Sequence, residues 1–379
     1  MNKTLVKLTT LFVVVFAFSV SLSAQCKKET KFFEPGKMWY DTDGHPINAH
    51  AGSVQKFDDG NYYWYGQIMI TGKRGSDAWV GVSCYKSKDL YSWEYVGVAL
   101  QVEDHASSLI TRGCKIEKPK VVYNKKYKQY IMYWHHDING EGHRNALVGV
   151  AKSDKPEGPF QLVRISKALA GFYPENIPAN EKTSDIGIYP FNYQFNGGEL
   201  PMHADSLKIY KRDLHVGQMV RDMTLFVDDN DKAYHIYASE ENSTLHIAEL
   251  TDDYLGYTGR YKRYFPGRFH EAPTVFKHKG VYYLISSGCT GWLPNPGRAA
   301  YSYDILGEWI EVENPFKGKD FETSFNSQPA CFFKEGENLI YIGDRWKPEN
   351  PVDARYVWLP FTIENNQPII KWVDKWSLK

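Results

Sequence analysis

Four polar residues stand at corresponding places in the chain, each just before a strand-like aromatic segment. They are Glu117, Asp222, Glu271 and Gln328. Hydrolysis of a glycosidic bond needs one protonated acid for the leaving oxygen and a second group that activates water. Two carboxyl groups can divide these tasks at neutral pH when their surroundings separate their pKa values. An ionised Asp222 beside Glu271 would raise the pKa of the glutamate by like-charge repulsion. The spacing therefore indicates acid-catalysed hydrolysis of a sugar linkage.

The elements that must position these residues are five similar hairpins. Each joins a strand end, a polar turn and an aromatic strand, and the copies span 57–65, 122–133, 226–237, 276–285 and 332–342. Further turn and strand patterns follow most copies, which predicts five four-stranded blades and an all-β, five-bladed β-propeller. A two-sheet sandwich is the alternative. The largest gap between copies predicts a long inter-blade insertion over residues 161–216.

Composition and the N-terminus narrow the class of protein. The chain balances 45 basic against 45 acidic residues, which gives no basis for binding nucleic acid. Residues 1–24 have a charged start, a short apolar run and small residues at their end, as in a signal peptide, and no membrane span is expected. Residues 25–379 are then a single propeller domain of an exported protein, periplasmic or secreted. Lipid attachment at Cys26 is the less favoured alternative.

Several longer strings resemble glycoside hydrolase family 43. Asp222 before a Phe-Val-Asp-Asp turn and Glu271 in a Glu-Ala-Pro triplet resemble the family in general. Further strings resemble the branch of this family that contains exo-β-1,3-galactanases. A sister branch that contains α-L-arabinofuranosidases has much the same strings. These strings are Ile47–His50, Tyr62–Gly66, Ser287–Trp292, Phe325–Gln328, Gly343–Trp346 and Arg355–Pro360.

The resemblance implies an inverting mechanism with assigned roles. Glu271 matches the general acid and Asp222 the residue that tunes it. The usual first-blade Asp is missing, because Ala51-Gly52 stands where Asp-Pro is expected. In the galactanase branch Gln328 would then position the attacking water, and inversion places the opposing group roughly 6.5–9.5 Å from the acid.

Other residues are expected to contact the sugar. Glu117 matches a further carboxylate of the branch, whereas Gln67 stands where the branch has a Glu that contacts the substrate. The remaining candidates are His50, Tyr85, Thr290, Trp292 and Arg345. A structural role for His50 and a packed position for Trp292 are the alternatives.

No metal or cofactor motif is recognised. Adjacent His135 and His136 on a strand would point to opposite faces, and the five Cys are scattered. The resemblance leaves room for a structural calcium ion in the channel.

The sequence thus predicts a monomeric exo-acting glycosidase. It would release galactose from the β-1,3-galactan backbone of a plant-type polysaccharide. The alternatives are an α-L-arabinofuranosidase acting on side chains of that polysaccharide and a non-catalytic carbohydrate-binding propeller.

Overall fold

A computed structural model describes residues 31–75, 79–103, 105, 107–183 and 208–379. Phe32–Lys379 forms one compact unit, whereas Met1–Lys31 forms a separate unit that falls almost wholly outside the described residues. The expected signal peptide and Cys26 therefore lie outside the described residues. Among the described residues, no helix is long and apolar enough to cross a membrane.

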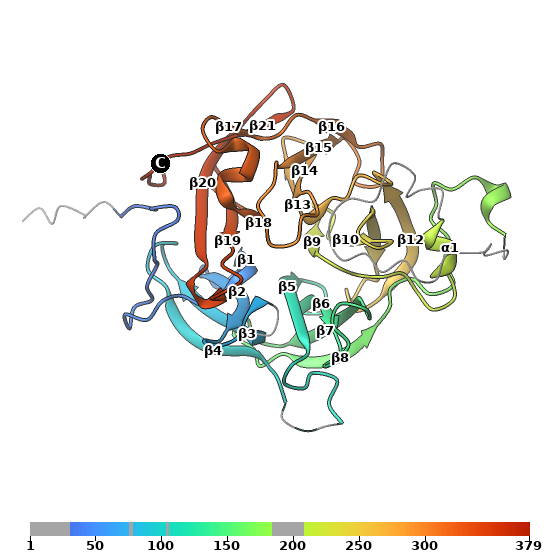
Figure 1. Cartoon of the computed structure of the whole chain (residues 1–379), viewed down its shortest axis with the longest axis horizontal. Helices are drawn as coiled ribbons and strands as arrows, with labels where there is room; N and C mark the ends of the chain where they lie inside the picture. The colour runs from blue at the N-terminus through green and yellow to red at the C-terminus, as the bar shows by residue number, and fades with distance from the viewer. Residues whose placement is uncertain (1–30, 76–78, 104, 106, 184–207) are drawn as a thin grey trace, which may run out of the picture. The chain divides into compact units, whose positions relative to one another are not determined.

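Five sheets, four of them antiparallel and the fifth with one added parallel strand, surround a common axis within Phe32–Lys379 (Figure 1). The first blade contains β1 (His50–Lys56), β2 (Tyr62–Met69), β3 (Trp79–Ser87) and β4 (Glu94–Gln101). The second contains β5 (Lys115–Asn124), β6 (Gln129–Asp137), β7 (Leu147–Ser153) and β8 (Gln161–Ser166). The third contains β9 (Met223–Val227), β10 (Ala233–Ser239), β11 (Thr244–Leu250) and β12 (Tyr257–Tyr264).

The last two blades follow the same order from axis to rim. The fourth contains β13 (Glu271–His278), β14 (Val281–Ser287), β15 (Arg298–Ser302) and β16 (Ile310–Val312). The fifth contains β18 (Gln328–Glu335), β19 (Asn338–Arg345), β20 (Arg355–Glu364) and β21 (Gln367–Lys371), and β17 (Phe316–Lys317) pairs in parallel with β21. The expected five-bladed propeller is confirmed.

The inner strands form a closed ring. β1 contacts β5, β5 contacts β9, β9 contacts β13, β13 contacts β18, and β18 contacts β1 again. An apolar cluster fills each interface between neighbouring blades, including the one between the fifth and first blades. Because both faces of each sheet are covered, the middle strands β10 and β11 of the third blade are buried along their whole length. This packing explains the many aromatic residues in the hairpins.

The ends of the propeller unit meet at the first and fifth blades. The backbone N–H of Phe33 donates to the carbonyl of Trp376 at 2.8 Å, and the N–H of Trp376 donates back at 3.1 Å. The two rings stack with their centroids 4.5 Å apart. The interface is thereby joined by main-chain as well as side-chain contacts.

The insertion between the second and third blades begins later than expected. β8 pairs with β7, so residues 161–166 are the outer strand of the second blade and not part of a loop. The insertion is closed at its base by backbone hydrogen bonds between Ala168 and Gln218. Its described part holds the short helices η2 (Ala179–Glu181) and α1 (Ile209–Arg212). Two more short helices, η4 (Phe321–Asn326) and η5 (Pro351–Asp353), lie in the fifth blade.

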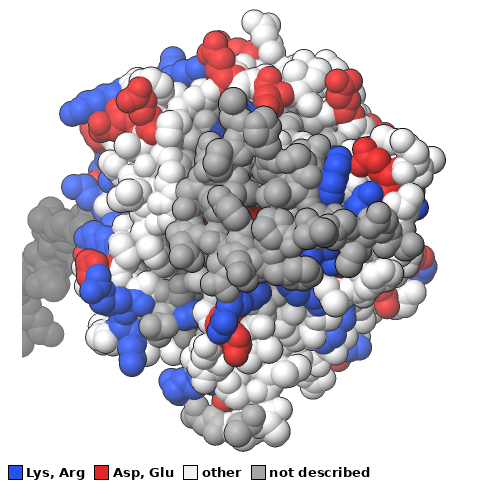
Figure 2. Space-filling model, turned by 45° about the vertical axis from the view of Figure 1, so that its right-hand side comes forward, with Lys and Arg blue, Asp and Glu red and all other residues white. Residues whose placement is uncertain are grey.

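Charge on the surface follows the balanced composition. Figure 2 shows basic and acidic side chains intermixed over the described parts of one face. No single sign of charge dominates the described parts in that view.

Candidate active site

A repeated irregularity in the inner strands positions the candidate residues. The pairing of the first and second strands of a blade shifts just after His50, Glu117 and Glu271, and just after the residue that follows Gln328. Such bulges bend a strand and redirect its side chains. Since the inner strands contact one another in a ring, the same offset in each blade brings these residues to one end of the axis.

Left-handed backbone accompanies three of these bulges. The residues after His50, Glu117 and Glu271 have φ values of 50°, 52° and 49°. A non-glycine residue in this region costs free energy and persists where the surrounding structure demands it. In the third blade Asp222 directly precedes β9, and its backbone carbonyl accepts the backbone N–H of Ala238 at 2.9 Å. The turn chemistry, and not only the strand pattern, therefore sets the site.

Glu271 has the properties of a general acid. Its side chain is partly buried, Oε2 accepts the amide N–H of Gln328 at 3.2 Å, and Oε1 lies 3.5 Å from Sγ of Cys289. Burial and then the negative charge of Asp222 raise the pKa of Glu271 to about 8, although the cation of Lys118 works against this rise. A carboxyl group with that pKa is largely protonated at neutral pH and can donate a proton.

Gln328 touches Glu271 directly. Its Nε2 donates to Oε2 of Glu271, and lies 3.4 Å from Oγ of Ser287. The water-sized gap expected between Glu271 and the group opposite it is therefore not found between these two side chains. Either the contact opens when a sugar enters or another group lies on the water side.

Lys118 is a site residue that sequence analysis missed. Its side chain is buried, and Nζ lies 2.7 Å from Oε1 of Gln328 and 3.4 Å from Oδ2 of Asp222. The same ammonium group lies 5.6 Å from the ring centroid of Trp346. Its position directly after Glu117 was visible in the sequence. A lysine in a strand is normally a surface residue, however, and only the left-handed bulge turns this one inward.

Glu117 belongs to a ring of charged groups with two histidines and a second carboxylate. Oε2 of Glu117 lies 2.6 Å from Nδ1 of His135, and Nε2 of His135 lies 2.8 Å from Oδ2 of Asp137. His143 lies 3.4 Å from Asp137 and 3.9 Å from Glu117. The sequence pattern did not reveal this ring, because His143 comes from the connection between β6 and β7.

The ring separates the pKa values of the site carboxyl groups. Burial alone would raise the pKa of Glu117, but His143 and His135 outweigh it and hold the pKa below its usual value. Burial likewise opposes the charge of His135, but Asp137 and Glu117 prevail and raise its pKa to about 10. Glu117 is therefore ionised at pH 7 while Glu271 keeps its proton.

The same ring bears on metal binding. Ligand atoms of Glu117, His135 and His143 lie within 4.8 Å of one another, so these residues could hold a metal ion. Strand alternation does separate His135 from His136, but partners from other segments complete the group. Ion pairs already match each imidazole of the ring with a carboxylate.

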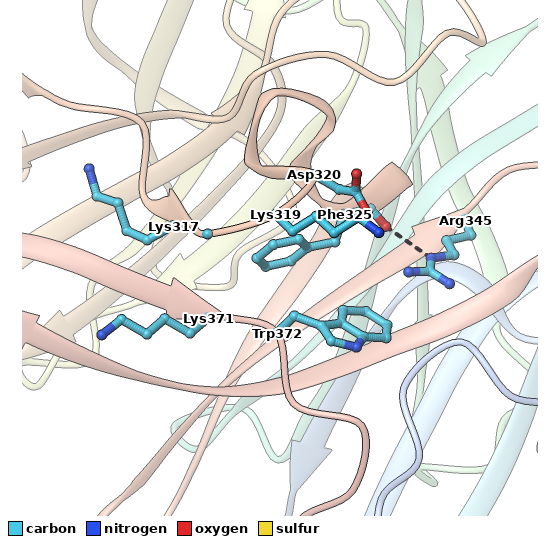
Figure 3. A pocket seen from close by; sticks show the side chains of 8 residues that line it. Lys317, Lys319, Asp320, Phe325, Arg345, Lys371 and Trp372 are labelled. Carbon is cyan, nitrogen blue, oxygen red and sulfur yellow. Dashed lines mark hydrogen bonds between the residues drawn. The ribbon is translucent and has the colours of Figure 1, made fainter.

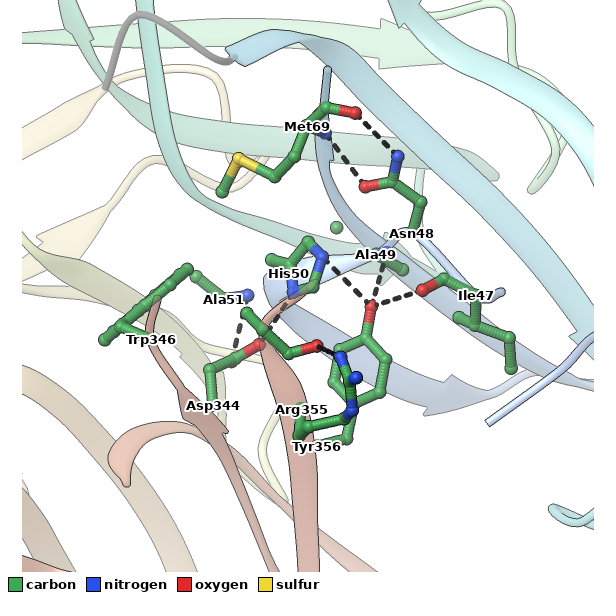
Figure 4. A network of polar contacts seen from close by, with 12 residues as sticks. Ile47, Asn48, Ala49, His50, Ala51, Met69, Asp344, Trp346, Arg355 and Tyr356 are labelled. Atoms are coloured by element: carbon green, nitrogen blue, oxygen red, sulfur yellow. Dashed lines mark hydrogen bonds and ion pairs between the residues drawn. The ribbon is translucent and has the colours of Figure 1, made fainter. Parts of the chain in front are cut away.

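His50 and Tyr85 are both buried, and His50 lies in the network of polar contacts that Figure 4 shows. Nδ1 of His50 lies 3.3 Å from Asp344, and Nε2 lies 3.5 Å from the hydroxyl of Tyr356. The hydroxyl of Tyr85 accepts the backbone N–H of Asn48 at 3.0 Å. Both residues hold the first strand in place, and the structural alternative for His50 accounts for all of its contacts.

The first blade has a physical reason for lacking the Asp-Pro pair. A Cβ atom at Gly52 would lie 1.5 Å from the carbonyl oxygen of Tyr65, so a proline cannot occupy that position. Asp344 accepts the backbone N–H of Ala51 at 3.0 Å. The buried Lys120 donates to the carbonyls of Ala51 and Gly52 at 2.8 and 2.6 Å, and burial lowers its pKa to about 7.

Two predicted sugar contacts lie on the loop after β14. The hydroxyl of Thr290 donates to the carbonyl of Leu293 at 2.6 Å and accepts from Asn295 at 2.7 Å, so it builds the turn. Trp292 is 37 % exposed and meets the ring of Trp346 edge-on, with centroids 5.6 Å apart. Because Nε1 of Trp346 donates to Gln328 at 2.9 Å, Trp292 is linked to the centre of the site.

Arg345 is not brought to this centre. Its Nε donates to the carbonyl of Phe325 at 2.9 Å, and its guanidinium lies 4.5 Å from the ring centroid of Trp372. Figure 3 shows both residues in a separate pocket. The pocket is lined by Lys317, Gly318, Lys319, Asp320, Phe325, Arg345, Lys371 and Trp372. Side chains alternate along β19, so Asp344 and Arg345 face different neighbours.

Gln67 is buried opposite His50 in the first blade. Its Nε2 has no hydrogen-bond partner within the described part of the chain. A buried donor without a partner costs free energy.

Comparison with known proteins points to one group of enzymes. No family model and no curated protein sequence matches the chain. Among solved structures, a GH43 β-1,3-galactosidase with galactodeoxynojirimycin is 42% identical, with a TM-score of 0.85, over 91% of this chain and 100% of that chain. An exo-β-1,3-galactanase from Clostridium thermocellum is 32% identical, with a TM-score of 0.72, over 91% of this chain and 66% of that chain. An exo-β-1,3-galactanase from Phanerochaete chrysosporium with galactose is 28% identical, with a TM-score of 0.71, over 92% of this chain and 68% of that chain.

Proposed function

Since the chain belongs to glycoside hydrolase family 43, we propose that it removes galactose from the end of β-1,3-galactan. The reaction inverts the configuration at the anomeric carbon. Its similarity to enzymes described as β-1,3-galactosidases and exo-β-1,3-galactanases supports this substrate. Glu271 is the general acid, and Asp222 keeps its pKa high. Gln328 positions the attacking water.

The observation that carries this proposal is the separation of two carboxyl groups. The pKa of Glu271 is raised to about 8, whereas that of Glu117 is held below its usual value. Opposite shifts in one site distinguish a proton donor from a charged partner. A propeller that only bound sugars would have no need to keep a carboxyl group protonated.

Glu117 is assigned to substrate binding. An ionised carboxylate accepts hydrogen bonds from sugar hydroxyls, and the ring with His135 and His143 fixes its orientation. Trp292 offers an exposed aromatic face beside the site. The apolar C–H face of a pyranose can pack on such a ring.

Gln328 must change its contacts during the reaction. The acid and the water stand on opposite sides of the anomeric carbon in an inverting enzyme, separated by roughly 6.5–9.5 Å. Sugar entering between Glu271 and Gln328 would break their 3.2 Å contact and make that space. The amide would then hold the water on the far side of the ring.

The remaining parts of the proposal concern the setting of the enzyme. We propose that it acts as an exported monomer on a plant-type polysaccharide and needs no cofactor. The targeting pattern of residues 1–24 supports export.

Product analysis tests this function. We expect purified protein to release galactose from β-1,3-galactotriose and β-1,3-galactan, and NMR spectroscopy to show the α-anomer first. Release of arabinose from an aryl α-L-arabinofuranoside, without action on galactan, would favour the α-L-arabinofuranosidase. Binding of galactan without release of any monosaccharide would favour the non-catalytic propeller.

A further inference from the structure

The side-chain amide of Gln328 is held on both sides. Its oxygen lies 2.7 Å from Nζ of Lys118 and 2.9 Å from Nε1 of Trp346. Its nitrogen lies 3.2 Å from Oε2 of Glu271 and 3.4 Å from Oγ of Ser287. Four groups from the second, fourth and fifth blades thus surround one amide.

The chemistry of these neighbours determines which way the amide faces. A lysine ammonium and an indole N–H can only donate hydrogen bonds, so the atom between them must be the acceptor oxygen. The NH₂ group must then face Glu271, which can accept. If the amide turned over, two donors would meet the NH₂ group and the carboxyl group would face an oxygen.

We propose that Lys118 and Trp346 are positioning residues that fix the amide of Gln328 with its oxygen turned away from Glu271. This inference rests on the proposed function, in which Gln328 holds the attacking water. Both lone-pair positions of the amide oxygen are occupied by donors. Water at Gln328 is therefore held through the NH₂ group, on the side where Glu271 lies before the sugar enters.

The two positioning residues differ in charge, which allows their roles to be separated. The pKa of Glu271 depends on four neighbouring groups, which are Asp222, Lys118, Cys289 and Glu117. Lys118 is the cation among them. Lys118 also lies 3.4 Å from Asp222. Loss of Lys118 removes both the donor to Gln328 and a positive charge near the acid. Loss of the Trp346 N–H removes a donor only.

Three variants test this arrangement. Lys118→Met removes donor and charge, and we expect kcat to fall about 10- to 100-fold, as for other losses of orientation, with KM nearly unchanged. We also expect the alkaline limb of the kcat profile to move to higher pH, because a cation near Glu271 has gone. Lys118→Arg should restore the limb to its wild-type position. Trp346→Phe should lower kcat without moving the limb.

A matched control and a double variant complete the kinetic experiment. Lys126→Met removes an exposed lysine from the turn of the same blade and should change neither kcat nor the pH profile. Because Lys118 and Trp346 hold the same oxygen, the loss in the Lys118→Met/Trp346→Phe variant should differ from the product of the single losses. A loss equal to that product would show that the two residues do not share a task.

A measurement without substrate separates this inference from the proposed function. In protein labelled at side-chain amides and carboxyl carbons, NMR spectroscopy should show the Gln328 NH₂ signals shifted in Lys118→Met and Trp346→Phe. The Glu271 carboxyl should titrate at higher pH in Lys118→Met only. Unchanged Gln328 signals in a folded Lys118→Met protein would overturn the inference, whatever the enzyme hydrolyses. Failure of wild-type protein to cleave galactan, with these shifts present, would overturn the proposed function alone.

Discussion

Nε2 of Gln328 lies 3.2 Å from Oε2 of Glu271, so two groups assigned to opposite sides of the reacting carbon touch each other. Oε2 accepts a hydrogen bond in this contact, and Oε1 accepts from Sγ of Cys289 at 3.5 Å. The sugar is therefore expected to separate the amide from the acid before the leaving oxygen of the substrate can take the proton of Glu271.

Glu271→Gln should abolish useful turnover. The amide cannot protonate the leaving oxygen, and loss of acid catalysis costs at least ~10²-fold in rate. The measurement is kcat on β-1,3-galactobiose, with circular dichroism to show the fold. Glu335→Gln, a variant at a surface ion pair, is the control. Near-wild-type turnover on this unactivated substrate would remove Glu271 from the role of acid.

Asp222→Asn should move the alkaline limb of the pH–rate profile to lower pH. The negative charge of Asp222 disfavours ionisation of Glu271, so its removal lets the acid lose its proton earlier. The alkaline limb reports this pKa because only protonated Glu271 is active. Asp231→Asn, at an exposed ion pair with Lys125, should leave the limb in place. An active Asp222→Asn enzyme with an unmoved limb would contradict the coupling.

His135→Gln should destabilise the protein most at mildly acidic pH. The pKa of His135 is raised to about 10 in the folded state against ~6.5 in the unfolded chain, so its contribution is complete below ~6.5 and is lost as pH rises toward 10. Denaturant unfolding at pH 6 and 9.5 should show a smaller difference from wild type at the higher pH. His45→Gln, at an exposed position, should show little difference at either pH. If the loss of unfolding free energy in His135→Gln were the same at both pH values, lost packing and not lost charge would explain the loss.

Trp292→Ala should weaken substrate binding and spare the chemical step. The ring is 37 % exposed and packs edge-on against Trp346, so it can contact a sugar without touching Glu271. We expect KM for galacto-oligosaccharides to rise several-fold while kcat stays near wild type, the pattern of a lost uniform binding contact. Trp292→Phe should recover most of the loss. A fall in kcat with unchanged KM would instead place Trp292 in the support of Trp346 and Gln328.

Removal of metal ions should leave activity unchanged. Glu117, His135 and His143 could bind an ion, but each imidazole of their ring already lies at ion-pair distance from a carboxylate. Dialysis against a chelator followed by assay, with metal content measured by mass spectrometry, checks this. Loss of activity that returns on adding Zn²⁺ or Ca²⁺ would identify the ring as a metal site.

The sequence allowed the blades and the acid to be predicted because both follow short patterns. The aromatic hairpins repeat five times, and Glu271 stands at a fixed offset from one of them. The start of the insertion was misplaced, since β8 carries exposed and half-buried residues that do not alternate clearly. Arg345 was grouped with the sugar contacts because its neighbours in the string are polar and aromatic. The strand then turns its side chain toward Trp372.

Lys118 and the charged ring could not be predicted for a different reason. Each depends on where a backbone bulge or a loop places a side chain in space. Lys118 faces inward because its own φ is 52°, and His143 reaches Glu117 from a connection between strands. No periodicity encodes such contacts. A lysine or histidine at these positions therefore looks like an ordinary surface residue until the fold is known.

The contact between Phe33 and Trp376 makes the propeller unit a natural candidate for circular permutation. The two residues share a pair of backbone hydrogen bonds, so a short glycine-rich peptide could join the chain beyond them. New termini could open at the exposed turn around Lys125 and Lys126, far along the chain from the acid. Each blade is built from consecutive strands, so such a permuted chain would divide only the hairpin of β5 and β6 between its two ends. A reporter or a surface anchor could then be attached to this enzyme at the new termini, away from residues 33 and 376.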